Sequence, residues 1–187
     1  MARIPAAILI VLLAVSCGVV KKKTSYGKER KITVNASEKE TEGTSETEEG
    51  TDPATTTEDA AKANEIISTA LTYSGVRYRY GGMTKKGMDC SGLLYVSFGT
   101  HDIPLPRVSY QMANEGRRIP INRVTKGDLL FFKTSRRGKK INHVGLVVAV
   151  EGDEIKFIHA TSSRGVIVSS LREGFWNYAF VKATRVL

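Results

Sequence analysis

Cysteine, histidine and tryptophan are scarce in this chain of 187 residues, which has two cysteines, three histidines and one tryptophan. So few cysteines exclude a small domain held by several disulfides, and no Cys-x-x-Cys or His-x-x-x-His spacing supports a zinc site. No glycine loop carries the lysine and hydroxyl residue of a P-loop. The longest apolar run, Ile4 to Val15, is shorter than the roughly 18 residues of a membrane-spanning helix. The length, without any internal repeat, favours a single domain.

The first 16 residues have the pattern of a secretory signal peptide. One basic residue, Arg3, precedes the apolar run, and the small residue Ser16 precedes Cys17. The junction resembles the bacterial lipoprotein signal, in which the cysteine after the cut carries a diacylglycerol, although Ala14 stands where leucine is usual. We expect an exported lipoprotein that faces the periplasm or cell wall and is anchored to a membrane through lipid on Cys17. Ordinary secretion with cleavage nearby is the alternative.

The composition changes between residues 17–59 and residues 60–187. The first segment is rich in Thr, Glu, Ser and Gly with few large apolar residues, so we expect a disordered tether. From Ala61 to Leu187 the chain has 20 Lys and Arg against nine Asp and Glu. That charge predicts an anionic partner. The carboxylate-bearing stem peptides of peptidoglycan fit, whereas export argues against nucleic acid.

Helical patterns come first and strand patterns follow, which predicts an α+β domain. Apolar spacing predicts a first helix with Thr57 as N-cap and Gly75 as its stop. A glycine-rich segment then leads into a second helix over Ser91–Phe98. Alternating apolar residues and turn signals predict five later strands: Leu129–Phe132, His143–Val150, Ile155–Ala160, Val166–Ser169 and Tyr178–Arg185.

Cys90 is the candidate nucleophile, because export and lipidation of the other cysteine would leave it as a lone thiol in an oxidising compartment. It lies where the glycine-rich segment meets the second helix. Free N–H groups and the helix dipole there favour a thiolate, and the N–H of Cys90 itself could donate to an oxyanion. A buried inert cysteine is the alternative.

The thiol needs a base, and His143 and His159 come from adjacent predicted strands. If residues 151–153 form a three-residue hairpin loop, His159 pairs with Gly145 and the two imidazoles share one face of the sheet. A two-residue loop would place them on opposite faces. In the first arrangement His143 is the general base and His159 orients its ring. His101 follows the second helix and is expected to be a surface residue.

The candidate catalytic residues belong to a series of motifs that resembles the NlpC/P60 cell-wall cysteine peptidases. The motifs are Tyr78-Arg79-Tyr80-Gly81-Gly82, Gly87-Met88-Asp89-Cys90-Ser91-Gly92-Leu93, Leu105-Pro106-Arg107 with Ser109 and Gln111, Gly127-Asp128-Leu129, His143-Val144-Gly145 and His159-Ala160. Their order and spacing agree with the family over the whole domain. The resemblance implies a papain-like fold, with N-terminal helices on a central antiparallel sheet, and a triad of Cys90, His143 and His159.

The resemblance also implies roles for residues around the triad. Tyr78 matches a tyrosine whose hydroxyl faces the oxyanion side. Asp89 and Ser91 match positions that line the site, and Arg107 and Gln111 match the motif after the nucleophile helix. The single catalytic domain is most similar to the small lipoprotein endopeptidases. The basic insert from Thr134 to Lys140 departs from the family and could border the groove.

These features together predict a monomeric endopeptidase that hydrolyses stem peptides or crosslinks of peptidoglycan through an acyl-enzyme on Cys90. The proposed chemistry requires no metal or cofactor. Two alternatives stay open at this point. One is a catalytically silent module that binds the wall through its basic face, and the other is a papain-like amidase or acyltransferase with the same nucleophile.

Overall fold

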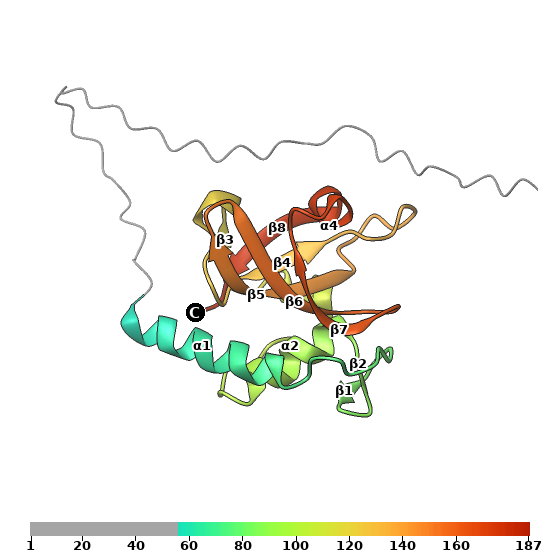
Figure 1. Ribbon diagram of the computed structural model, residues 1–187, viewed down its shortest axis with the longest axis horizontal. Coiled ribbons are helices and arrows are strands. Elements are labelled where there is room, and N and C mark those ends of the chain that lie inside the picture. Colours follow the sequence, from blue (N-terminus) through green and yellow to red (C-terminus); the bar gives the residue numbers. More distant parts are fainter. Residues whose placement is uncertain (1–55) are drawn as a thin grey trace, which may run out of the picture.

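The computed structural model describes residues 56–187, in which helices pack against an antiparallel sheet (Figure 1). The elements in chain order are α1 (Thr57–Leu71), β1 (Met83–Thr84), β2 (Gly87–Met88), α2 (Cys90–Gly99), α3 (Ser109–Met112), β3 (Arg117–Ile119), the 3-10 helix η1 (Ile121–Arg123), β4 (Leu129–Phe132), β5 (His143–Glu151), β6 (Glu154–Thr161), β7 (Gly165–Ser170), α4 (Gly174–Ala179) and β8 (Phe180–Arg185). The signal peptide, Cys17 and most of the expected tether lie outside the described residues. None of the described helices is long and apolar enough to span a membrane.

Six strands form the main sheet in the order β3-β8-β4-β5-β6-β7, and every neighbouring pair is antiparallel. Helices α1 and α2 cover one face of it (Figure 1). The buried side chains of that face include Phe131 and Leu146, whereas Phe132 and Phe157 belong to a second cluster on the opposite face with Trp176. Burial on both faces is why β4 is apolar at every position. The expected α+β architecture is confirmed.

Helix α1 begins at Thr57, one residue earlier than its predicted cap implies. Thr56, not Thr57, is the N-cap, and its hydroxyl accepts from the N–H of Asp59 while the Asp59 carboxylate accepts from the N–H of Thr56. This reciprocal pair is a capping box. The helix ends at Leu71, before the glycine at position 75. Four buried side chains recur at helical spacing and face the sheet: Ala63, Ile66, Ile67 and Ala70.

The predicted strands agree with the structure except at the C-terminal end, where Tyr178 belongs to α4 and β8 begins at Phe180. Several short elements were not predicted, namely β1, β2, β3, α3 and α4. Each has two to six residues, which is too short to repeat a helical or strand period. Helix α2 includes Cys90 as its first residue, so the candidate nucleophile lies at a helix start as expected.

Candidate active site

Cys90 is held at the beginning of α2 with only 7% of its surface exposed. The preceding residue, Asp89, caps the helix, because its Oδ1 accepts a hydrogen bond of 2.6 Å from the N–H of Gly92. An N-cap of this kind keeps the first turn of a helix in place. The position of the thiol is therefore determined by the residue next to it.

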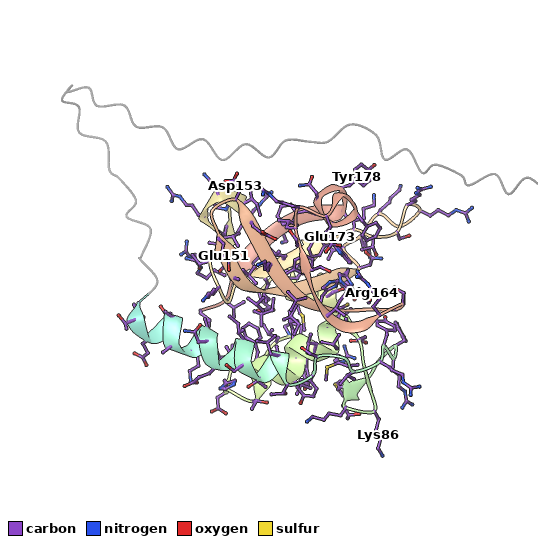
Figure 2. The ribbon with its side chains drawn as sticks, in the orientation of Figure 1. Lys86, Glu151, Asp153, Arg164, Glu173 and Tyr178 are labelled. Carbon is purple, nitrogen blue, oxygen red and sulfur yellow. The ribbon has the colours of Figure 1, made fainter. Side chains whose placement is uncertain are left out.

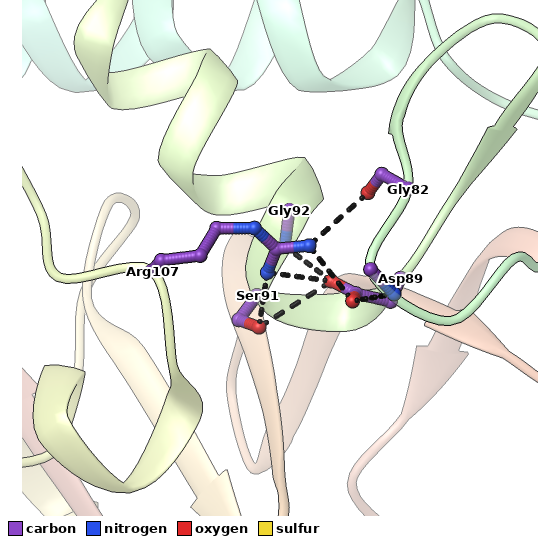
Figure 3. A network of polar contacts seen from close by, with 6 residues as sticks. Gly82, Asp89, Ser91, Gly92 and Arg107 are labelled. Atoms are coloured by element: carbon purple, nitrogen blue, oxygen red, sulfur yellow. Dashed lines mark hydrogen bonds and ion pairs between the residues drawn. The ribbon is translucent and has the colours of Figure 1, made fainter.

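A network centred on Arg107 fixes the chain on both sides of the thiol (Figure 3). Arg107 donates to both oxygens of Asp89, with Nη1 3.0 Å from Oδ1 and Nη2 2.8 Å from Oδ2. Nη1 also donates to Ser91 Oγ at 2.9 Å, and the N–H of Gly81 donates to Asp89 Oδ2 at 2.7 Å. Bidentate charge-assisted pairs impose geometry as well as attraction. The network ties the glycine-rich loop to the start of α2.

His143 and His159 lie side by side on β5 and β6. His143 Nε2 and His159 Nδ1 are 2.9 Å apart and share a hydrogen bond. The ladder pairs Leu146 with Ile158, so His159 follows opposite Gly145. This is the predicted register, and it brings both imidazoles to the same face.

The loop length that was predicted to set this register is wrong. Glu151 pairs with Glu154, so the hairpin loop has two residues, 152–153, instead of three. A two-residue loop alone would turn the imidazoles to opposite faces. A β-bulge at Val148 shifts the register by one residue and restores the shared face.

Strands β5 and β6 separate at the end that carries the histidines. The described β5–β6 ladder stops at Leu146. The N–H of Val147 donates to the carbonyl of Asp128, on the β4 side of the strand. N–H directions alternate along a strand, so the N–H of Val144, three residues earlier, points to the opposite side, toward β6. It lies close enough to the Cys90 thiol to favour the thiolate. The Cys90 thiol thus meets the sheet one residue from His143.

Burial determines the charge of these groups. It raises the pKa of the Cys90 thiol, against the opposing effect of the Val144 N–H. It also lowers the pKa of His143 to about 4, and burial with the neighbouring charges lowers that of His159 to about 2. Burial therefore opposes the thiolate that the helix start favours, and desolvation is the larger of the two effects. Within residues 56–187, no hydrogen bond joins Cys90 Sγ to either imidazole.

The hydrogen bond between the imidazoles determines which nitrogen of His143 is left to accept the proton of the Cys90 thiol. Nε2 of His143 is engaged with His159, so Nδ1 is left for the proton of Cys90. Nδ1 accepts a proton only in the tautomer that carries hydrogen on Nε2, which then donates to His159 Nδ1. In that arrangement His159 carries its own proton on Nε2, a buried atom with no partner among the described groups.

Aromatic side chains enclose the histidine pair. Trp176 stacks on His143, with ring centroids 5.1 Å apart and planes at 23°, and meets His159 edge-on at 4.5 Å. Phe157 lies 4.6 Å from the His159 ring, and Phe132 lies 5.9 Å from that of His143. These rings exclude water, which is the cause of the lowered imidazole pKa values. Sequence reasoning missed Trp176, whose one signal is that it is the only tryptophan in the chain.

Comparison with known proteins identifies the family. The family model described as "NlpC/P60 family" matches residues 75–185, a span that contains Cys90 and both imidazoles of the pair. The chain belongs to the NlpC/P60 family.

Curated NlpC/P60 relatives include enzymes of Escherichia coli (strain K12). The protein named murein DD-endopeptidase MepS/murein LD-carboxypeptidase is 36% identical over 125 residues, which cover 66% of this chain and 63% of that protein. The probable endopeptidase NlpC is 41% identical over 116 residues, which cover 62% of this chain and 72% of that protein. The chain thus spans about 63% of the length of the first of these relatives.

Solved NlpC/P60 structures have the same fold. A family protein from Bacillus cereus superposes with a TM-score of 0.61 at 27% identity, covering 67% of this chain and 40% of that one. A protein described as similar to lipoprotein, NLP/P60 family, from Staphylococcus aureus gives a TM-score of 0.60 at 30% identity, covering 69% and 42%. The papain-like fold expected from the resemblance is confirmed.

Of the remaining predicted site residues of this NlpC/P60 domain, two are partly buried and one is exposed. Tyr78 is half-buried, and its pKa is raised first by burial and then by the nearby Cys90 and Asp89. Gln111 is exposed on α3, and Arg107 is engaged in the network described above. Contact of these residues with substrate stays a prediction. In the described part of the chain, no cluster of three or more His, Cys, Asp or Glu side chains could hold a metal ion.

Proposed function

We propose that this chain is a cysteine endopeptidase that hydrolyses peptide bonds in the stem peptides or crosslinks of peptidoglycan. The observation that carries the proposal is the position of the buried Cys90 thiol, which meets the sheet at Val144 beside the hydrogen-bonded pair of His143 and His159. The relatives support the substrate class, since one is named a murein DD-endopeptidase and another a probable endopeptidase.

In the first half of the reaction Cys90 attacks the carbonyl carbon of the scissile bond. As the S–C bond forms, the thiol proton moves to Nδ1 of His143, and the carbonyl electrons move onto oxygen. In this proposal the backbone N–H of Cys90 and the hydroxyl of Tyr78 donate to that oxyanion. The raised pKa of Tyr78 keeps its hydroxyl protonated as a donor at neutral pH.

Collapse of the tetrahedral intermediate breaks the C–N bond. The leaving amine takes the proton from His143, and the acyl group stays on sulfur as a thioester. Water then gives a proton to His143 and attacks the thioester, which releases the carboxylic acid and returns the thiol. Throughout, His159 accepts the Nε2–H of His143 and so stabilises the imidazolium that forms twice in each cycle.

Mass spectrometry of purified muropeptides digested by the wild-type and the Cys90→Ala protein tests this function. We expect the wild-type protein to release peptide fragments whose masses identify the cleaved bond, and the variant to release none while circular dichroism shows an intact fold. Cleavage by the purified variant would refute the proposal.

The same digest separates the alternatives. An amidase would free the intact stem peptide from the sugar, and an acyltransferase would need an acceptor amine. Binding to sacculi by the wild-type protein without any released product would indicate a catalytically silent module.

We also propose that the protein is exported and anchored to a membrane by lipid on Cys17, a residue outside the described part of the chain. The pattern of the first 17 residues supports this location. Cys17→Ser should move the protein from the detergent phase to the aqueous phase in a phase-partition assay of cells. Retention of the variant in the detergent phase would contradict lipidation at this residue.

A further inference from the structure

The two connections next to the histidines leave the sheet at the same end. Strand β5 begins at His143 and its antiparallel neighbour β6 ends at Thr161. The connection before β5, residues 133–142, and the turn after β6, residues 162–164, therefore emerge together. We call them the histidine-end loops. Both extend beyond the sheet on the right of Figure 1.

The histidine-end loops carry positive charge only. They contain no Asp or Glu, and six exposed cations lie in them: Lys133, Arg136, Arg137, Lys139, Lys140 and Arg164. The turn at the opposite end of β5 and β6, residues 151–154, has three acids and no base. Figure 2 shows this separation, with Glu151 and Asp153 on one side of the molecule and Arg164 on the other. The sheet thus has one cationic end, and it is the end with the catalytic pair.

The longer loop is closed at its base beside the catalytic imidazole. Asn142 Oδ1 accepts from the N–H of Thr134 at 2.8 Å, and Asn142 Nδ2 donates to Thr134 Oγ1 at 3.0 Å. The Nζ of Lys140 lies 5.7 Å from the ring centroid of Tyr110 on α3, a cation–π contact. Asn142 directly precedes His143. The cations of this loop are therefore held near the proposed base.

Arg164 lies in the shorter loop, directly before a glycine that packs on the segment leading to Tyr78. The N–H of Arg164 donates to Thr161 Oγ1 at 3.1 Å. Gly165, with φ of 71°, packs so closely on Val76 that an added Cβ would lie 2.2 Å from the Val76 carbonyl oxygen. Val76 is two residues before Tyr78. The positive charge of Arg164 also contributes to the lowered pKa of His159, so its guanidinium lies near the pair.

None of these cations has a carboxylate partner in residues 56–187, where the ion pairs join other residues. Unpaired guanidinium groups gathered at one end of the sheet attract anions. Arginine in particular presents a planar pair of donors that matches a carboxylate. A stem peptide carries free carboxylates close to its peptide bonds, so its chemistry complements this end of the sheet.

We propose that the histidine-end loops bind a free carboxylate of the stem peptide next to the scissile bond and so select stems that retain it. This specificity rests on the proposed function. It predicts that the loops contribute to substrate binding and not to the chemical step.

Steady-state kinetics on purified muropeptides test this site in the full chain. Arg164→Gln and the double variant Arg136→Gln/Arg137→Gln should each raise KM about tenfold with kcat within about twofold of wild type. The matched control is Lys85→Gln/Lys86→Gln, which removes two exposed charges from the β1–β2 turn, where Lys86 points away from the sheet (Figure 2). The control should leave KM unchanged. Muropeptides with amidated carboxylates should give the same high KM with wild type and both arginine variants.

An unchanged KM in both arginine variants, or an equal rise in the lysine control, would overturn the inference. Weaker binding to whole sacculi with an unchanged muropeptide KM would overturn it too, because the loops would then bind an anionic wall polymer. Titration calorimetry of muropeptides into Cys90→Ala chains with and without Arg164→Gln separates the two proposals. Lower affinity in the double variant supports the carboxylate site even if the wild-type protein cleaves nothing, an outcome that would contradict the proposed function alone.

Discussion

Cys90 and the two histidines combine reactive chemistry with deep burial. Burial favours the uncharged form of each group, and their pKa shifts have the corresponding signs: upward for the thiol and downward for both imidazoles. Burial therefore favours a neutral thiol and neutral imidazoles before substrate binds. In the proposed mechanism the thiol proton moves to His143 during attack on the substrate.

Alkylation of Cys90 by iodoacetamide checks the charge of the thiol. The rate of modification, followed by mass spectrometry of the peptide that contains Cys90, should keep rising with pH to above about 9, because only the thiolate reacts and burial raises the thiol pKa. A rate that is already constant between pH 5 and pH 8 would show a preformed thiolate–imidazolium pair and contradict this account.

The buried histidines also make stability depend on pH. The unfolded chain takes up protons on both imidazoles below their ordinary pKa of about 6.5, whereas the folded chain resists this until about pH 4 for His143 and about pH 2 for His159. The free energy of unfolding should therefore fall between pH 6.5 and pH 4, by about 1.4 kcal/mol per pH unit for each imidazole. Urea unfolding at several pH values measures this slope. His159→Asn should reduce it by about half, and an unchanged slope in that variant would contradict the assignment.

At the scale of elements, the start of α2 depends on a buried ion pair. Asp89 caps the helix and binds Arg107 with both oxygens. Asp89→Ala should lower the free energy of unfolding by about 3 kcal/mol, because it removes the cap and leaves the guanidinium unpaired. The matched control is Asp59→Ala in the exposed capping box of α1, with an expected loss below about 1 kcal/mol.

Double variants show whether Asp89 and Arg107 act as a pair. Asp89→Ala/Arg107→Ala should be no less stable in urea than Asp89→Ala, because the uncompensated charge is gone. If the loss of unfolding free energy in the double variant equals the sum of the losses in the two single variants, the two side chains stabilise the loop independently.

The elements that could be predicted from sequence are those long enough to show a period. Helix α1 and strands β5 and β6 repeat their apolar pattern several times, whereas α3, with four residues, cannot. The bulge at Val148 was missed because Val147, Val148 and Ala149 are all apolar, so a shift of one residue leaves no trace in the pattern. The predicted register of the histidines was correct, although the loop assumed for it was not.

The candidate site shows the same limit. Cys90 and the two histidines could be identified because their residue types carry chemistry and their motifs are distinctive. Trp176 could not, because its role comes only from a contact between α4 and two strands that precede it in the chain. Asp89 was predicted to line the site, and Arg107 was predicted to belong to the motif after the nucleophile helix. Their mutual pairing, which positions α2, required coordinates.

At the scale of the whole molecule, charge is distributed along the sheet. Cationic loops lie at the histidine end, and the acidic turn lies at the other end. A positive active-site end raises the local concentration of anionic substrate and orients it before contact. Together with the proposed lipid anchor, this arrangement suits the proposed activity on a fixed polymer of negatively charged peptides.

The central claim is that Cys90 and His143 act as one unit, and a double-variant cycle of kcat/KM for muropeptide cleavage tests it most directly. Cys90→Ala and His143→Ala should each lower kcat/KM by at least about a thousandfold, and the double variant should be no slower than either. A further multiplicative loss in the double variant, or a single variant within about tenfold of wild type, would contradict the claim.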